Sequence, residues 1–467
     1  VILYAVRWMA RRLFLNASGE VGFENSVALP VLASLLATSY HFSAWLLHDA
    51  FLDYPLTAAV TAGFALLIKA GDFTSRRDAV IFGLAAGLGL LVKQTYAFFF
   101  ILPAIYVVFN ALRARSSRAI ANLVLAGLVA AGVAAIWYGP HLSDVIAIYR
   151  VNREAAANEN EAPLFSFMSN AFYVHALLSH QLQVPFASLF VIGLLYSLAR
   201  LRRESVMLYL WLVGGIVAFT LIANKDVRYT VPVLPAAALV SVCWIREFYK
   251  SNLRAMLSYL KLFLVTAIAV WAGVSFFNAQ WPREGMGYYW DTPRFRWMVF
   301  ARNYYGFDHR PLAEDWSVPK IVMAVHVDSE SRSVDLEQRT LKRPRPEETV
   351  SPLTSSSPQR RPRLGVVVNL PHLNPSSVGL YSRLFSAGRA APPLIDVEYI
   401  VVETALDRLE GCDYLLVRTG LESAEWVAPV ERTVERHIAD SPTKFINVAR
   451  FPIPIKGAEA VVYRLQR

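Results

Sequence analysis

The sequence predicts an α-helical domain that crosses a membrane many times, followed by a small α/β domain. Three observations predict this architecture. The chain is 55% hydrophobic and 18% charged over 467 residues, which is too apolar for an ordinary soluble protein. The apolar residues gather in long runs before about residue 280, and basic residues fall in short loops between these runs. From residue 364 onward, shorter apolar runs alternate with polar stretches.

The long apolar runs match the thickness of a bilayer, whose hydrocarbon core needs about 20 apolar residues per helix and tolerates about 17. We expect about nine complete crossings and one partial crossing at the N-terminus. The complete runs lie at residues 26–46, 54–70, 79–93, 95–112, 119–138, 185–200, 206–223, 231–247 and 261–278.

Basic residues in alternate loops predict the orientation of these helices, because loops rich in Lys and Arg stay in the cytoplasm. The opposite side then holds residues 49–53, 93, 139–184, 224–230 and everything after about residue 280. The formal charge of +10 is explained by this topology, and no base-reading motif predicts a nucleic-acid partner. The cytoplasmic loops carry Arg11 and Arg12; Arg76 and Arg77; Arg113, Arg115 and Arg118; Arg200, Arg202 and Arg203; Arg246, Lys250 and Arg254.

Two carboxylates stand ahead of the second complete run, in the stretch LLHDAFLDYPLTAAV. Asp53 precedes Tyr-Pro-Leu-Thr, and Asp49 lies one helical turn earlier. We interpret both as candidate catalytic residues, since a carboxylate at a membrane surface can act as a general base. Two alternatives remain open: Asp53 as a helix N-cap with Pro55 in the first turn, and both residues as parts of a solvated loop.

Cations at two other places predict an anion site on the same side of the membrane. Lys93 interrupts an apolar hairpin, where it either holds a lipid phosphate or extends toward headgroups. The stretch NKDVRYTVPVLP carries Lys225, Arg228 and Tyr229 just before a helix that begins with two prolines. Arg binds phosphate through two parallel hydrogen bonds and Lys adds a point charge. The alternative is an ordinary polar turn with an interfacial tyrosine.

Other motifs predict no further chemistry. Cys243 and Cys412 provide no disulfide framework, and no His spacing predicts a metal site, so no cofactor is predicted and a divalent metal is left open. Gly83, Gly87 and Gly89 indicate close helix packing rather than a ligand loop.

The chain after the last crossing divides into three parts. Residues 281–327, rich in aromatic and charged side chains, form a connector. Residues 328–363 are polar and rich in Pro and Ser, and we expect a disordered linker. In residues 364–467, LGVVVNL, DYLLVRT, FINVARF and AVVYRLQ predict strands, and SSVGLYSRLFS and VERTVERHIAD predict helices.

With these motifs together, the chain resembles the GT-C superfamily of integral-membrane glycosyltransferases. It is similar to the bacterial branch that includes dolichyl-phosphate-mannose–protein mannosyltransferases and the aminoarabinose transferase. The resemblance rests on LLHDAFLDYPLTAAV, GLAAGLGLLVKQTYAFFFILPAI and NKDVRYTVPVLPAAALV in this order, and on LGVVVNLPHLNP, GCDYLLVRTG and AVVYRLQR near the end. It implies a GT-C-like membrane domain over residues 1–280 and an extracytoplasmic α/β domain over 364–467.

The resemblance also implies a function. A sugar on a polyprenyl phosphate would be transferred to a lipid, glycan or protein acceptor outside a bacterial inner membrane. Lys93, Lys225, Arg228 and Tyr229 would then bind the donor phosphate, and Asp53 would match the second acidic position. Because the chain begins inside an apolar run without Met, we expect a fragment that lacks the first outer loop and its main catalytic base. The alternative function is a transporter or flippase for a lipid-linked glycan, which is expected to show internal repeats.

Overall fold

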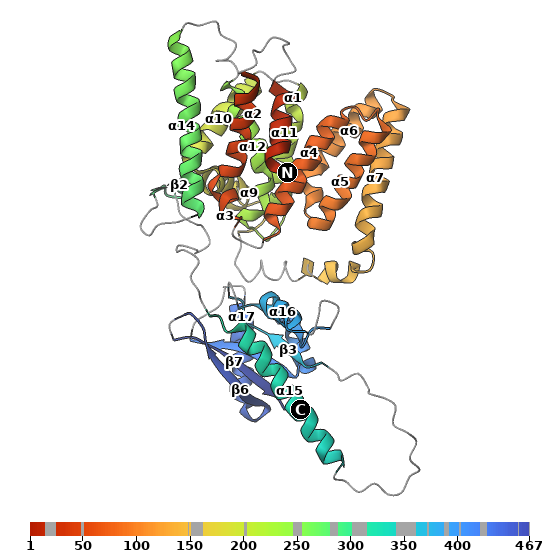
Figure 1. The fold of residues 1–467 in the computed structure, drawn as a ribbon, viewed down its shortest axis with the longest axis vertical. Helices are drawn as coiled ribbons and strands as arrows, with labels where there is room; N and C mark the ends of the chain where they lie inside the picture. Colours follow the sequence, from red (N-terminus) through yellow and green to blue (C-terminus); the bar gives the residue numbers. More distant parts are fainter. Residues whose placement is uncertain are drawn as a thin grey trace. The chain divides into compact units, whose positions relative to one another are not determined.

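The computed structural model describes residues 1–14, 25–47, 51–147, 149–150, 162–199, 203–245, 255–280, 288–300, 315–341, 361–370, 373–386, 392–400, 403–420, 427–455 and 457–466. Within the chain, two compact units are distinguished (Figure 1). The first comprises residues 1–146 and 162–311, and the second residues 147–161 and 312–467.

The first unit is a bundle of helices with one short hairpin (Figure 1). Its helices are α1 (Ile2–Phe14), α2 (Asn25–Ser39), α3 (His41–Trp45), α4 (Asp53–Ala70), α5 (Arg76–Val92), α6 (Tyr96–Arg113), α7 (Ser117–Tyr138), α9 (Phe167–His175), the π-helical η1 (Ala176–Gln181), α10 (Gln183–Ala199), α11 (Arg203–Thr220), the 3-10 helix η2 (Val227–Val233), α12 (Leu234–Cys243) and α14 (Ala255–Gln280). The antiparallel strands β1 (Tyr288–Asp291) and β2 (Arg296–Phe300) form the hairpin.

Each of the nine predicted apolar runs contains a helix of this bundle. In the described chain, residues 96–113, 117–138 and 262–280 are long and apolar enough to cross a membrane. A fourth span results if residues 167–181 and 183–199, bent by 117°, are counted together, and 28–39, 205–220 and 227–243 are shorter apolar helices. The protein is therefore a multi-pass membrane protein.

Glycines let α5 approach its neighbours closely, as the sequence predicted. A Cβ on Gly83 would lie 2.5 Å from the carbonyl oxygen of Ala126 in α7, and one on Gly87 would lie 2.6 Å from Val133 Cβ. Such distances are too short for any larger side chain, so the backbones of α5 and α7 meet directly. This packing fixes the end of α5, where Lys93 follows.

The second unit is a five-stranded sheet with helices on both faces. Its strand order is β4-β3-β5-β7-β6, in which β4, β3 and β5 are parallel and β7 and β6 are antiparallel additions. The elements are α15 (Val318–Leu341), β3 (Arg363–Val366), α16 (Pro375–Leu384), β4 (Asp396–Tyr399), the 3-10 helix η3 (Glu403–Gly411), β5 (Tyr414–Thr419), α17 (Ala428–Asp440), the 3-10 turn η4 (Pro442–Lys444), β6 (Phe445–Pro452) and β7 (Glu459–Leu465).

Alternating side chains of the central strands fill two cores. Leu416 lies in the core shared with α15 and α16, whereas Leu415 and Val417 lie in the core shared with α17. This alternation is the period of two expected for a sheet covered on both faces. The four strands and two helices predicted from residues 364–467 are all present, which confirms the α/β domain.

Helix α15 corrects the predicted linker. Residues 328–341 are helical, so the prediction of disorder from residue 328 is wrong there; residues 342–360 lie outside the described chain. Val318, Ile321 and Val325 recur at helical spacing and are buried in the core, which also moves the start of this unit upstream of residue 364.

Polar contacts fix the helix beyond its apolar half. Asp328 accepts hydrogen bonds from Tyr414 Oη at 2.7 Å and from Arg464 Nη1 at 3.0 and 3.1 Å. Burial and the bond to Asp328 raise the pKa of the Tyr414 phenol above its ordinary value, so the phenol stays a neutral donor. Composition alone did not reveal these long-range contacts.

Candidate functional site

An ion pair joins the beginning of α4 to the end of α5. Lys93 Nζ lies 2.7 Å from Asp53 Oδ1, and the side chains are 20% and 4% exposed. Lys93 stands directly after Val92, with an extended backbone that ends the helix. Asp53 is the first residue of α4, and Leu52 takes the N-cap position without a side-chain cap bond. The helix-cap alternative for Asp53 is therefore wrong, and its carboxylate is held by Lys93 instead.

Tyr229 brings a third segment to this pair. Lys93 Nζ lies 5.4 Å from the centre of the Tyr229 ring, within the range of a cation–π interaction. The Tyr229 hydroxyl donates to Asn224 Oδ1 at 3.3 Å. The beginning of α4, the end of α5 and η2 thus meet around the ammonium group of Lys93. The sequence analysis identified these three segments separately.

Arg228 forms a second charged pair beside the same 3-10 helix. Its Nε donates to Asp226 Oδ2 at 2.9 Å, and its Nη2 contacts the same oxygen. Asp226 Oδ1 accepts from the Arg228 backbone N–H at 2.8 Å, so this carboxylate also caps η2. The guanidinium carbon lies 4.0 Å from the centre of the Phe51 ring. Arg228 is therefore held in one orientation, and its side chain is 21% exposed.

The ammonium of Lys225, which the sequence predicted as a phosphate-binding group, contacts backbone carbonyl oxygens. Its ammonium donates to the carbonyl oxygens of Thr220 at 2.7 Å, Ile222 at 2.6 Å and Phe219 at 3.3 Å. These carbonyls belong to the last turn of α11 and the turn that follows, where carbonyls lack partners within the helix. Three acceptors match the three N–H groups of an ammonium, and Lys225 is 7% exposed.

Two residues that the sequence analysis missed support η2. Gln181 Nε2 donates to the carbonyl oxygen of Val227 at 2.6 Å and to Thr230 Oγ1 at 2.9 Å. Trp211 Nε1 donates to the carbonyl oxygen of Pro232 at 2.9 Å. Both side chains supply partners for buried polar groups of a 3-10 turn. Because Gln181 ends η1 and Trp211 lies in α11, nothing near the loop in sequence indicates them.

Asp53, Lys93 and Tyr229 form one cluster, and Arg228, paired with Asp226, is the chain neighbour of Tyr229 in η2. An ammonium has three N–H donors, and Asp53 engages Lys93 through Oδ1. Such a group can accept an additional anion without losing its partner. Asp49, the other predicted carboxylate, lies outside the described residues. Within the described ranges, no three His, Cys, Asp or Glu side chains come together as a metal site.

Comparisons with known proteins identify the fold. No protein-family model matches the chain, and no curated protein sequence does. Among solved structures, ArnT from Cupriavidus metallidurans bound to undecaprenyl phosphate matches with a TM-score of 0.50 and 16% identity, covering 99% of this chain and 81% of that one. The apo form of that ArnT matches with a TM-score of 0.49 and 15% identity over the same shares.

The chain has a GT-C-like fold. The similarity extends over nearly the whole chain, including the small α/β unit, and ArnT is an aminoarabinose transferase of this kind. The GT-C-like architecture expected from the resemblance is thereby confirmed. Within this fold, the Asp53–Lys93 cluster is built where the ends of α4 and α5 meet η2.

Proposed function

We propose that this chain is a membrane glycosyltransferase that takes a sugar from a polyprenyl-phosphate-linked donor. The GT-C-like fold supports this class of enzyme, and the ArnT structure bound to undecaprenyl phosphate supports a polyprenyl phosphate as the lipid part of the donor. The observation that carries the proposal is the partly exposed ammonium of Lys93, which Asp53 and Tyr229 hold at the end of α5.

In the proposed reaction, an acceptor hydroxyl oxygen attacks the anomeric carbon of the donor sugar. The bond from that carbon to the phosphate oxygen breaks, and the electron pair leaves with the polyprenyl phosphate. The acceptor proton passes to a general base. Lys93 and Arg228 stabilise the charge on the departing phosphate, which is the usual work of preorganised cations in group transfer. Tyr229 contributes by fixing the ammonium from its ring face.

Asp53 takes a positioning role in this scheme. Its carboxylate is almost fully buried, and its Oδ1 accepts from Lys93. An acceptor hydroxyl would have to compete with that ammonium for the carboxylate, so we assign to Asp53 the orientation of Lys93. The general base then comes from elsewhere, and Asp49 remains the candidate that the sequence offers.

The acceptor is a lipid, glycan or protein at the extracytoplasmic surface of the bacterial inner membrane. The alternation of basic loops supports this side for the cluster and for residues 281–467. A flippase for a lipid-linked glycan is the competing function. A pathway for transport is expected to place polar groups near the middle of the bilayer, whereas these charges lie at helix ends next to η2.

A reconstituted assay separates the two functions. The full-length protein is placed in lipid nanodiscs with a radiolabelled sugar on undecaprenyl phosphate and an acceptor extract from bacterial membranes. A flippase would leave the donor chemically unchanged. A nanodisc has no enclosed compartment, so only chemical conversion of the donor is measured in it. The proposal predicts release of free undecaprenyl phosphate together with transfer of label to an acceptor. Movement of intact donor across a proteoliposome membrane, with no cleavage under either condition, would establish the flippase instead.

A further inference from the structure

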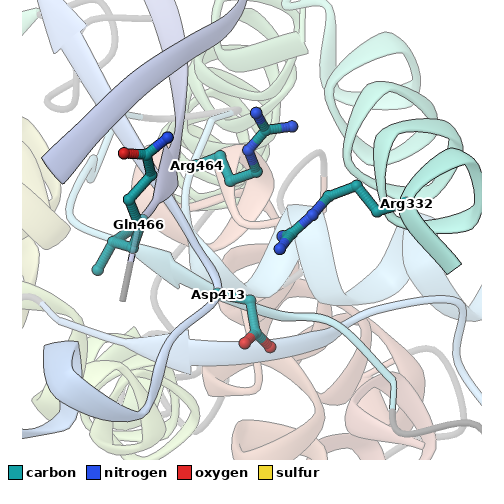
Figure 2. A pocket seen from close by; sticks show the side chains of 5 residues that line it. Arg332, Asp413, Arg464 and Gln466 are labelled. Carbon is teal, nitrogen blue, oxygen red and sulfur yellow. The ribbon is translucent and has the colours of Figure 1, made fainter. Parts of the chain in front are cut away.

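A hollow in the second unit lies among polar side chains of three elements. It has a volume of about 340 Å³ and is lined by Arg332 of α15, Asp413 before β5, and Arg464, Leu465 and Gln466 at the end of β7. Figure 2 shows Arg332 reaching from the helix toward the strand side, opposite Gln466, with Asp413 below them. Four of the five lining residues are polar or charged, so the hollow suits a polar ligand.

The walls of this hollow are held by contacts outside it. Arg464 is oriented by Asp328, whose carboxylate also accepts from Tyr414. Asp413 Oδ2 accepts from the backbone N–H of Arg363 at 3.0 Å. The backbone N–H of Leu465 donates to the carbonyl oxygen of Asp413 at 3.0 Å, which ties two lining segments together. A site held in this way loses little freedom when a ligand enters.

The charge of the lining predicts an anion. The lining holds two guanidinium groups, Arg332 and Arg464, and one carboxylate, Asp413. Asp328, outside the lining, pairs with Arg464, so Arg332 is the guanidinium that an added anion would mainly engage. Arg332 follows Asp328 by one helical turn, so both point from the same side of α15. A guanidinium donates two parallel hydrogen bonds to a carboxylate or phosphate, which makes Arg332 the natural contact for such a group.

The remaining groups predict hydroxyls beside that anion. A carboxylate accepts from hydroxyl groups, and the Gln466 amide both donates and accepts. Leu465 is the single apolar residue of the lining, so a mainly apolar molecule would leave these polar groups without partners. A volume of about 340 Å³ lies near the lower end of the ligand-site range of about 300–1,000 Å³, which fits one sugar ring better than a chain.

We propose that the α/β unit carries its own binding site for one acidic sugar, a hexose-sized ring with a phosphate or carboxylate group. Arg332 and Arg464 contact the acid, and Asp413 and Gln466 contact ring hydroxyls. The site lies within the second unit alone and does not depend on the proposed transferase function. The sugar is either free in solution or the end of a longer glycan.

Isothermal titration of the full chain in detergent tests the proposal. The probes are glucose 6-phosphate, glucuronate, an oligosaccharide ending in glucuronate, and, as references, glucose and inorganic phosphate. We expect at least one acidic sugar to bind more tightly than either reference. Tighter binding of the oligosaccharide than of glucuronate assigns the site to a glycan end, and the reverse order assigns it to a free sugar. No binding of any acidic sugar, or equal binding of inorganic phosphate, overturns the proposal.

Three variants locate the binding. Arg332→Ala should weaken acidic-sugar binding by about 10- to 100-fold, as expected for loss of a charged hydrogen bond. Gln466→Ala should weaken sugar phosphate binding while leaving the weak binding of inorganic phosphate unchanged. Arg436→Ala is the control, because Arg436 is an exposed arginine of α17 in the same unit, outside the lining. Unchanged affinity in Arg332→Ala, or an equal loss in Arg436→Ala, contradicts the assignment.

Discussion

Lys93 Nζ donates to Asp53 Oδ1 at 2.7 Å, which joins residues 40 positions apart at the ends of two apolar helices. A nearly buried carboxylate is costly without a partner, and an ammonium at a helix end offsets that cost. The same contact leaves Lys93 20% exposed. The pair is therefore buried enough to stabilise the fold and exposed enough for the anion contact that we propose.

The first prediction concerns this pair. Lys93→Gln leaves the Asp53 carboxylate buried without its cation, a loss of up to about 3–5 kcal/mol for a fully buried pair and less here because Lys93 is partly exposed. Asp53→Asn in the same chain removes that charge and should restore part of the stability. Thermal unfolding in detergent of the two single variants and the double variant measures the coupling, which we expect within about 0.5–3 kcal/mol. Strictly additive losses would show that the pair contributes nothing.

The second prediction concerns Arg228. Arg228→Ala should reduce turnover by about 100- to 1,000-fold if its guanidinium stabilises the leaving phosphate. Arg228→Lys should also be damaging, because a point charge cannot replace the planar fork that Asp226 orients. Arg77→Lys is the matched control, since Arg77 is an exposed residue in the first turn of α5, at the other end of that helix from Lys93. Near-normal turnover and donor affinity in Arg228→Ala would show that Arg228 does not bind the donor phosphate.

The third prediction separates the two parts of the segment from 328 to 363. Deletion of residues 342–360 should leave the α/β unit resistant to protease, because a shorter connection changes loop entropy only slightly. Asp328→Ala should reduce that resistance, since it leaves Tyr414 and Arg464 without their shared acceptor. Limited proteolysis of the purified full chain compares the two. Greater protease sensitivity of the deletion variant than of Asp328→Ala would show that residues 342–360, and not the contacts of Asp328, stabilise the unit.

The fourth prediction is the membrane topology. The loops at Arg76, Arg113, Arg202 and Lys250 should face the cytoplasm, and residues 281–467 should lie outside. Single cysteines at Ser117 and Ser357, in a background with both native cysteines replaced, are labelled in intact cells with an impermeant maleimide. Only the second should react before the cells are opened. Reaction of both from one side rejects the orientation.

The sequence predicted a helix in each of nine apolar runs of the first unit and four of the five described strands of the second, because long apolar runs and alternating buried residues are local signals. Strand β4 (Asp396–Tyr399) was not predicted. The sequence also indicated Asp53 and Lys93 separately, since each places a charge at the end of an apolar run. Their contact could not be read from the sequence, because it depends on how α4 and α5 pack.

Two other features depend on contacts that the composition does not contain. Lys225 has the charge expected of a phosphate ligand, and its ammonium donates to backbone carbonyl oxygens at the end of α11 and in the turn that follows. Residues 328–341 are polar enough to suggest disorder, yet Asp328 is held by side chains from two distant strands. In both places the structure depends on a contact between residues that the amino-acid composition does not predict.

The most direct test of the proposed site is the affinity of the purified full chain for undecaprenyl phosphate, measured in nanodiscs for the unchanged protein, Lys93→Gln and Lys69→Gln. Lys69 is the control, because it is an exposed lysine in the last turn of α4, the opposite end from Asp53. We predict that Lys93→Gln weakens binding by about 10- to 100-fold, the loss expected for one charged hydrogen bond, and that Lys69→Gln leaves it unchanged. A folded Lys93→Gln protein that binds undecaprenyl phosphate as tightly as the unchanged protein would contradict the site.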